Sequence, residues 1–354
     1  MASGTSPLVT TSLDLRSSAP ACVVRTPVAT RHACGGSLNS APNLVGTICS
    51  SDKLWLESLA PVMTPSPVST GGNAIVYFNI GANKGFNIVT FLRRYANHSL
   101  TGHAWMSEMD NFARRTRTRY SRVQSKQYRS CGRCGGCFDD LPGVGLAASE
   151  VDVHAFELLP ANVAWLRWAL AAFGVRASLS HKAVSNVTAP AFTPRAAAGG
   201  LGYEKASYRP MWGWGYVRSH SLALDDYFAE EEIKFAHVLS IDAEGADTQI
   251  LRGLSDTLAA NRVGVVEFEG KGRDADAENV EWLRHMNYSC FVETASGCIL
   301  PASCGTSSVL CRTAKGESDT CGNFVCGQGA FLEQLWLLSN ACATCSPEEL
   351  QARV

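Results

Sequence analysis

Residues 74–85 read AIVYFNIGANKG, and this stretch carries the strongest signal for the architecture. Residues 74–80 are short, β-branched and aromatic, which is typical of a strand buried on both faces of a parallel sheet. A glycine turn follows at once, and residues 86–95 then place apolar side chains at helical spacing. Such a turn lets the backbone approach a ligand closely and offers unpaired N–H groups at the helix start. A nucleotide-like cofactor fits there, although glycine turns also serve many βα junctions that bind nothing.

A second strand with an acid at its end favours cofactor binding. Residues 151–156 (VDVHAF) alternate as a strand, which is followed by Glu157 and then by a helical run. A doubly wound nucleotide-binding fold places a ribose-binding carboxylate at this position. Glu157 is therefore the predicted ribose ligand, and the simpler alternative is a surface Glu favoured by a helix N-terminus.

The alternation of strands and helices continues along the chain. Residues 177–184 form a third candidate strand, with Ser185 at its end near the expected adenine edge. Residues 237–241 form another, and Asp242 and Glu244 follow it. In extended backbone, the carboxylates of these two residues would point the same way, toward the crevice beyond the sheet. A plain turn is the alternative for these two acids. Six or seven strands alternating with helices predict a doubly wound α/β fold with a mostly parallel sheet.

Four ordered blocks resemble FkbM-type methyltransferases: NIGANKG from Asn79, AFELLPAN from Ala155, LALDDYF from Leu222 and SIDAEGADTQILRG from Ser240. The resemblance implies a class I, Rossmann-like methyltransferase fold that uses S-adenosyl-L-methionine. It commonly goes with O-methylation of a hydroxyl on a sugar or another small metabolite.

The resemblance also implies a set of site residues. The methionine part of the cofactor would contact Asn79, Gly81, Asn83 and Gly85, and the ribose would contact Glu157. Asp242 and Glu244 would lie on the methyl-acceptor side of the pocket.

Methyl transfer to oxygen requires the protein to position the acceptor and help to remove its proton. Asp242 or Glu244 is the predicted base, and His237 or His220 is the alternative. The chemistry needs no metal, although a pocket holding Asp242, Glu244 and Glu267 could admit one.

Two residues depart from the family pattern. Asn79 stands where Asp is usual, so a charge that could orient the methionine ammonium is missing, while the amide keeps the size and the hydrogen bonding. Ser240 stands where a Lys commonly precedes the Ile-Asp pair, which removes one cation from the site. Weakened or lost catalysis is the alternative that these departures leave open.

An insertion over about residues 100–148 separates the glycine turn from Glu157. In nucleotide-binding folds without such an insertion, the cofactor acid usually lies about 20 residues after the glycine turn. It contains many arginines and no acid between Asn111 and Phe138. Such a stretch could bind phosphate, sulfate, a uronic acid or nucleic acid, or could close as a lid over the acceptor. A solvated loop is the simpler alternative.

Cysteines crowd the periphery of the sequence. Cys131, Cys134 and Cys137 form a CxxCxxC run that can present three thiolates to one structural zinc, with a fourth ligand from elsewhere. Many others lie in residues 290–345, which make a Cys-rich C-terminal extension. Disulfides or free thiols are the alternatives to zinc.

The 354 residues are 46% hydrophobic and 18% charged, which fits a globular chain. We expect a leader over residues 1–70, disordered or organelle-targeting, a methyltransferase domain over 71–330, and a tail over 331–354. Three Asn-X-Ser/Thr tripeptides mildly favour a secretory lumen instead. The net charge of −1 makes nucleic acid an unlikely partner, and no apolar run reaches the about 18 residues of a membrane span.

Two other functional classes are alternatives to the methyltransferase. A dehydrogenase is expected to carry a GxGxxG turn, and Asn83 at the centre of GANKG disfavours dinucleotide binding. A non-catalytic Rossmann-like binding module, which holds an acidic glycan or another polyanion through the Arg-rich insertion, is better supported. For the enzyme, the predicted partner is a small-molecule or glycan hydroxyl, with an anionic group as a candidate feature of the substrate.

Overall fold

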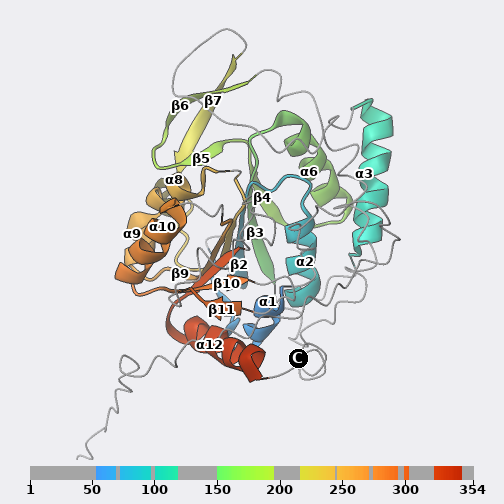
Figure 1. Ribbon diagram of the computed structural model, residues 1–354. Coiled ribbons are helices and arrows are strands. Elements are labelled where there is room, and N and C mark those ends of the chain that lie inside the picture. The colour runs from blue at the N-terminus through green and yellow to red at the C-terminus, as the bar shows by residue number, and fades with distance from the viewer. Residues whose placement is uncertain are drawn as a thin grey trace, which may run out of the picture.

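The computed structural model describes residues 53–68, 72–96, 100–118, 150–194, 216–243, 245–270, 274–293, 299–302 and 323–344. These residues form a central sheet with helices packed on both faces (Figure 1).

The central sheet has nine strands in the order β11-β10-β12-β9-β8-β2-β3-β4, with β1 paired to β2 outside this path. Five neighbouring strands run parallel: β4 (Ala177–Ser180), β3 (Val151–Phe156), β2 (Asn73–Ile80), β8 (Ala236–Ile241) and β9 (Val263–Phe268). The others pair antiparallel: β12 (Phe324–Gly327), β10 (Ser289–Glu293), β11 (Ile299–Pro301) and β1 (Ser66–Pro67). This mostly parallel sheet confirms the predicted α/β class.

Two layers of helices cover the sheet (Figure 1). One layer comprises α1 (Leu54–Ser58), η2 (Ala60–Val62), α2 (Phe86–Tyr95), α6 (Pro160–Ala172) and α12 (Gly329–Thr344), and α3 (Gly102–Thr116) packs on the outer side of α2 and α6. The other comprises α7 (Leu224–Glu230), α8 (Asp247–Arg252), α9 (Ser255–Ala259) and α10 (Asp274–His285). The chain runs from β2 outward to β3 and β4 and returns on the other side of β2 at β8, so the sheet is doubly wound.

Strand β2 shows why its sequence reads as a continuous apolar run. Ile75 and Tyr77 belong to the hydrophobic cluster on the face of α2 and α6, while Val76, Phe78 and Ile80 belong to the cluster on the other face. Successive side chains of a strand point to opposite faces, so a strand covered on both sides is apolar at most positions, and the buried Asn79 is the exception in this run.

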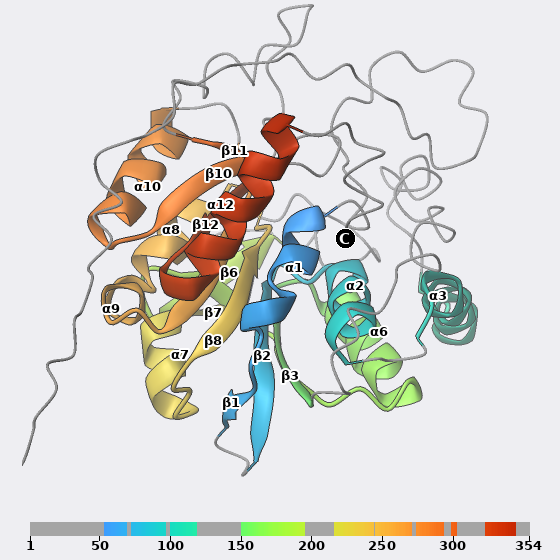
Figure 2. The same ribbon diagram turned by 90° about the horizontal axis from the view of Figure 1, so that it is seen from below.

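The folded region reaches N-terminally past Gly71, where we expected the domain to start. Trp55 and Leu59 are 0% exposed, and α1 lies beside α12 on one face of the sheet (Figure 2). The Tyr95 hydroxyl donates to the Leu56 carbonyl oxygen, and Arg94 pairs with Glu57 at 3.1 Å. Residues 53–63 are therefore packed against the core.

Helix α12 lies mostly within the expected tail, yet it too packs on the sheet. Its side chains Leu335 and Leu338 are buried in the cluster that contains Val325 of β12. The apolar residues of this helix are thus needed to cover the sheet beside β12 and β9.

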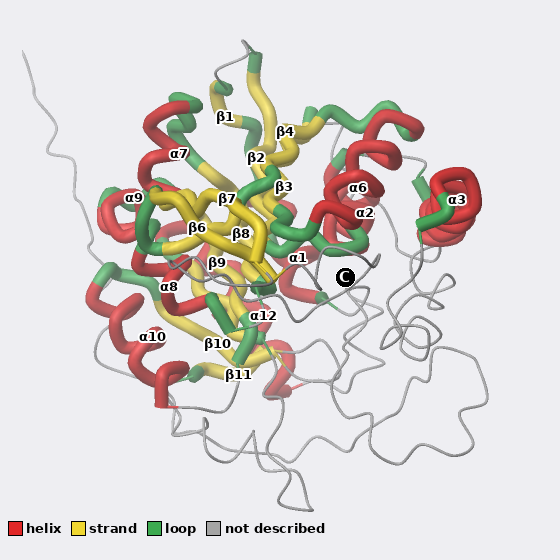
Figure 3. Tube along the Cα trace, turned by 90° about the horizontal axis from the view of Figure 1, so that it is seen from above, coloured by secondary structure: helices red, strands yellow, loops and turns green. Residues whose placement is uncertain are grey.

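The expected strand over residues 177–184 is in fact two strands in different sheets. β4 joins the central sheet, whereas β5 (Ala183–Ser185) pairs with β7 (Tyr216–Ala223) in a three-stranded sheet of order β5-β7-β6, with β6 (Ala189–Pro194). The exposed residues His181 and Lys182 separate the two strands. Seen from above, β6 and β7 lie over the central sheet on the side of α8 and α10, away from α3 (Figure 3).

Among the described residues, one pair of cysteines is bonded. Cys290 of β10 and Cys326 of β12 are register partners and form a disulfide across the two strands. The candidate zinc ligands Cys131, Cys134 and Cys137 lie outside the described residues.

Candidate functional site

The carboxyl ends of β2, β3 and β8 lie side by side because β2 is between the other two strands. The chain leaves β2 toward β3 on one side and returns at β8 on the other, which makes this edge the switch point of the doubly wound sheet. Ligands of such folds bind in the crevice outside the strand ends at this point. The predicted residues after these strands therefore converge on one edge.

Gly81 fills a position where no side chain fits. Its φ is 78°, and an added Cβ would lie 1.9 Å from the main-chain oxygen of Asp242. The N–H groups of Gly81 and Ala82 both donate to the Phe156 carbonyl oxygen, at 2.9 and 3.0 Å, and the Asp242 N–H donates to Ile80 at 2.9 Å. The turn is thus held by main-chain contacts to the ends of β3 and β8.

Glu157 binds the glycine turn directly. Its Oε2 accepts the Asn83 N–H and its Oε1 accepts the Leu159 N–H, both at 2.7 Å. The side chain is 6% exposed, and burial raises the pKa of the carboxyl, against the opposing effect of the two backbone donors. The Asn162 side chain and the Leu158 N–H oppose this rise in the same way, and the ribose role of Glu157 stays a prediction. This second role, as a clamp on the turn, was not visible in the sequence.

Gly85 is explained by packing. An added Cβ would lie 2.7 Å from Trp105 Cζ2 and 2.8 Å from Leu166 Cδ2. The indole N–H groups of Trp105 and Trp165 both donate to the Lys84 carbonyl oxygen, at 2.7 and 3.0 Å. Close approach of α3 and α6 therefore requires glycine here, and contact of Gly85 with the cofactor stays a prediction.

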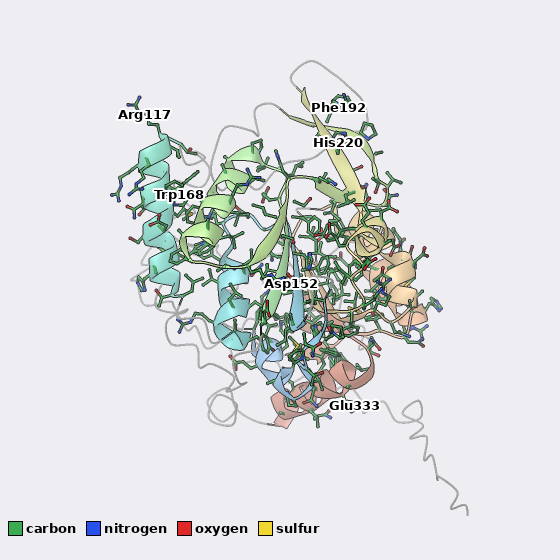
Figure 4. All side chains as sticks on the ribbon, turned by 180° about the vertical axis from the view of Figure 1, so that it is seen from behind. Arg117, Asp152, Trp168, Phe192, His220 and Glu333 are labelled. Atoms are coloured by element: carbon green, nitrogen blue, oxygen red, sulfur yellow. A yellow bond between two sulfur atoms is a disulfide. The ribbon has the colours of Figure 1, made fainter. Side chains whose placement is uncertain are left out.

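Part of the insertion is a helix that supports the site. Trp105, Met109 and Phe112 of α3 are buried in the core shared with α6. Trp168 of α6 faces α3 (Figure 4), where its indole N–H donates to Glu108 at 2.7 Å. The beginning of the insertion is therefore not a solvated loop, whereas the Arg-rich and Cys-rich stretch from residue 119 lies outside the described residues.

A row of polar side chains crosses one face of the sheet just below this edge. Asn79 of β2 is the register partner of Ser240 of β8, and Ser240 is the partner of Glu267 of β9. The Ser240 hydroxyl donates to Glu267 Oε2 at 2.7 Å. Lys53, which precedes α1, forms an ion pair with Glu267 Oε1, and Asn323 donates to the same oxygen at 2.8 Å.

This arrangement corrects the expectation of an acidic pocket holding Asp242, Glu244 and Glu267. The Glu267 side chain is buried beside Lys53, which neutralises it, whereas Asp242 is exposed beyond the end of β8. Lys53 was missed because nothing near it in the sequence connects it with a strand end 214 positions away.

Asn79 is 1% exposed, and its Nδ2 donates to the Tyr77 hydroxyl at 3.1 Å. Its Oδ1 is buried and has no hydrogen-bond partner among the described residues. Burial raises the pKa of the Tyr77 phenol, and the negative charge of Glu267 adds to this effect. Tyr77 therefore stays protonated.

The remaining predicted residues are placed apart. Ser185 lies in β5 of the second sheet, where its hydroxyl donates to Asn186 Oδ1 at 3.2 Å and its carbonyl oxygen faces Gly253. Its role at the adenine edge stays a prediction. Glu244 lies outside the described residues.

The two candidate histidines differ in their surroundings. His237 is at the amino end of β8, where Nδ1 accepts the Val76 N–H at 3.0 Å and Nε2 is 2.6 Å from the Thr64 carbonyl oxygen. Both nitrogens are used, and burial lowers the pKa of the ring, so His237 is structural and is wrong as an alternative base. His220 is exposed on β7, opposite Pro190 of β6 (Figure 4).

Within the described ranges, no group of three or more His, Cys, Asp or Glu side chains is arranged to hold a metal ion. In the same part of the chain, no helix combines the length and apolar character that a membrane crossing needs.

A mostly parallel α/β sheet with a glycine turn and an acid at its switch point is typical of nucleotide-binding folds, and it fits a methyltransferase domain. Residues 131–290 match the family model for the methyltransferase FkbM domain. This match supports an FkbM-type methyltransferase, and it includes three of the four sequence blocks, those from Ala155, Leu222 and Ser240. The match includes Glu157 and Asp242, whereas Asn79 and the glycine turn precede it. Comparisons with curated proteins and with solved structures found no significant match.

Proposed function

We propose that this chain is an S-adenosyl-L-methionine-dependent methyltransferase that methylates a hydroxyl group of a sugar or another small metabolite. The observation that carries the proposal is the junction of Glu157 with the Asn83 N–H at 2.7 Å. It brings the acid after β3 against the glycine turn after β2, at the switch point of the sheet.

The residues at this edge fit the cofactor. Glu157 would accept hydrogen bonds from the ribose hydroxyls, as the acid at this position of a doubly wound fold does. The buried Oδ1 of Asn79 is an acceptor suited to an ammonium group. Gly81 and Asn83 would bring main chain against the methionine part, and Ser185 is the candidate for the adenine.

When bound, S-adenosyl-L-methionine supplies an electrophilic methyl group on a sulfonium sulfur. The protein must then hold the acceptor oxygen in line with that group and take its proton. Asp242 is exposed where β8 ends, and its main chain is fixed by the hydrogen bond to Ile80. It is our candidate base, with Glu244 two residues later as the other.

Methyl transfer to a panel of glycosides and hydroxylated metabolites tests this function. The full-length chain is incubated with S-adenosyl-L-methionine, and mass spectrometry detects the methylated product and S-adenosylhomocysteine. Loss of one general base lowers reaction rates by about 10²- to 10⁴-fold. Asp242→Asn or Glu244→Gln should therefore lower the methyl-transfer rate by this factor, while the affinity for S-adenosylhomocysteine stays unchanged. A chain that binds the cofactor but methylates no hydroxyl, while it methylates an amine or a thiol, would refute the acceptor class.

A second candidate function is supported by exposed cations in the insertion. Arg114, Arg115 and Arg117 are exposed at the end of α3, and Arg117 points outward there (Figure 4). They adjoin the Arg-rich stretch that we expected to bind an acidic glycan or another polyanion. Salt-sensitive binding of a sulfated glycan that is lost in an Arg114→Ala/Arg117→Ala variant, in a chain that binds no cofactor, would favour this binding module over the enzyme.

A further inference from the structure

One of the Asn-X-Ser/Thr tripeptides of the sequence forms the turn between α10 and β10. Asn287 is exposed there, Tyr288 is buried, and Ser289 is half-buried at the start of β10. This tripeptide, with any residue except proline in the middle, is the acceptor for N-linked glycans. Such glycans are bulky and solvated, so their asparagine must lie at the surface. Asn287 meets both the sequence requirement and the requirement for exposure.

The main chain of this turn explains why an asparagine is exposed at position 287. The Asn287 N–H donates to the Arg284 carbonyl oxygen at 3.1 Å, and the Tyr288 N–H donates to the Leu283 carbonyl oxygen at 3.0 Å. This pattern ends a helix with a left-handed residue, and the φ of Asn287 is 66°. Asparagine tolerates that conformation better than most residues. The tripeptide is therefore compatible with the fold without any adjustment.

Tyr288 holds the turn in place from its buried side. Its side chain is 1% exposed, and its hydroxyl donates to the Val263 carbonyl oxygen at 2.6 Å. The Asn287 side chain makes no hydrogen bond within the described ranges of the chain. The amide of Asn287 can thus be modified without loss of a contact that anchors the turn.

The turn lies at the edge of the sheet opposite to the candidate cofactor site. β10 is antiparallel to β12, and β12 is antiparallel to β9, so β10 runs in the same direction as β9. Asn287 precedes β10 and is therefore at the amino edge of the sheet. Glu157 and Asp242 follow β3 and β8 at the carboxyl edge. A glycan on Asn287 would leave the carboxyl edge open to cofactor and acceptor.

The disulfide of β10 is a second observation, independent of the tripeptide. Cys290 lies three residues after Asn287 and is bonded to Cys326. Disulfides form and persist in oxidising environments such as the lumen of the endoplasmic reticulum and the cell exterior, and they are rare in the cytosol. N-linked glycans likewise belong to secreted proteins. Two separate chemical features of one turn and strand thus indicate the same environment.

The other two tripeptides are less suited to carry a glycan. Asn97 lies outside the described residues. Asn186 is exposed, but its Oδ1 accepts the hydroxyl proton of Ser185 at 3.2 Å, and Ser185 is the candidate ligand for the adenine. A glycan on Asn186 would stand beside that candidate residue, whereas one on Asn287 would not.

We propose that Asn287 is an N-glycosylation site and that the chain folds in an oxidising secretory lumen. The donor is an oligosaccharide linked to a polyprenyl diphosphate, and the transferase of the host catalyses the step. A bond forms between Asn287 Nδ2 and the anomeric carbon of the first sugar. The bond from that carbon to the diphosphate oxygen breaks, the polyprenyl diphosphate leaves, and the amide nitrogen loses one proton.

Mass spectrometry of the full-length chain, purified from the cells that make it, tests this site. Trypsin should release a peptide from His285 to Arg312, which contains Asn287. This peptide should carry the mass of hexose and N-acetylhexosamine residues on Asn287. Asn261 is a matched control within the same protein, because it is exposed, has a φ of 55° and precedes β9 at the same edge. It should be unmodified, since Val263 stands where an acceptor needs Ser or Thr.

Two pairs of variants expressed in the same cells separate the tripeptide from the fold. Ser289→Ala should abolish the glycan, whereas Ser289→Thr should retain it. Asn287→Asp should also abolish it, while it keeps a residue that tolerates the left-handed backbone. Thermal unfolding verifies that each variant is folded.

An unmodified Asn287 in the wild-type protein, or a glycan that persists on it in Ser289→Ala, would overturn the inference. Neither result concerns cofactor binding, so the proposed function would stand. A chain that is glycosylated at Asn287 but binds no S-adenosylhomocysteine would refute the proposed function alone.

Discussion

Gly81 and Asp242 meet through their main chains at the carboxyl edge of the sheet, where a Cβ on Gly81 would lie 1.9 Å from the Asp242 carbonyl oxygen. The contact joins the ends of β2 and β8. It holds the turn that would approach the cofactor against the strand that bears the candidate base. Any side chain at position 81 must push these strand ends apart.

Gly81→Ala should therefore destabilise the fold and abolish cofactor binding. A left-handed backbone alone costs an alanine about 1–2 kcal/mol, and the main-chain clash adds to that. Gly174→Ala is the control, because Gly174 also has a positive φ, 62°, but nothing lies within 4 Å of its added Cβ. Urea unfolding should show the greater loss for Gly81→Ala, and equal losses in the two variants would show that the contact with Asp242 is unimportant.

Removal of the disulfide between Cys290 and Cys326 should lower the free energy of unfolding. The bond closes a loop with a sequence separation of 36, for which the chain-entropy relation gives about 4 kcal/mol. A Cys290→Ser/Cys326→Ser variant should unfold at lower denaturant concentration than the wild type under oxidising conditions. Peptide mapping without reduction should recover the cross-linked pair, and finding both thiols free in the oxidised protein would contradict the pairing.

Stability should fall in mild acid through His237. Burial lowers the pKa of its ring in the folded state, so between the unfolded value near 6.5 and the lower folded value the unfolded chain binds more protons. The stabilising effect is complete above about pH 6.5 and is lost as the pH falls below it. His237→Gln keeps a donor and an acceptor without titrating, so its melting temperature should fall less between about pH 7 and pH 5. Parallel profiles for the two proteins would disprove the assignment.

Trp105 should couple the inserted helix α3 to the cofactor site. It is fully buried beside Gly85 and donates to Lys84 in the glycine turn. Trp105→Ala should cost about 3–5 kcal/mol of stability and weaken S-adenosylhomocysteine binding at temperatures where the variant is folded. Leu337→Ala is the control, since Leu337 is 62% exposed and such surface changes stay within about 0.5 kcal/mol. Unchanged ligand binding by folded Trp105→Ala would show that α3 does not support the turn.

The central strands could be predicted because each is covered on both faces. This requirement makes β2, β3, β8 and β9 mostly apolar, with buried exceptions such as Asn79, His154, Ser240 and Glu267. Glycines and acids mark where these strands end. The glycine turn and Glu157 were recognisable for the same reason, since their chemistry depends on neighbours close in the sequence.

Other features depend on contacts that no local pattern records. Helix α1 has five residues, too few to show helical periodicity, and its burial depends on α12 at the other end of the chain. The division of β4 from β5 follows from pairing with β7, which comes later in the sequence. The pairing of Lys53 with Glu267 arises only once α1 is packed on the sheet.

Calorimetric titration of the full-length chain with S-adenosylhomocysteine, beside a Glu157→Ala variant, tests the central claim most directly. The account predicts micromolar binding by the wild type and its loss in the variant, because Glu157 would hold the ribose and also clamps the Asn83 N–H. Glu150→Ala, which removes an exposed acid just before β3, should bind like the wild type. A folded wild-type chain that does not bind S-adenosylhomocysteine, or a Glu157→Ala variant that binds it equally well, would contradict the account.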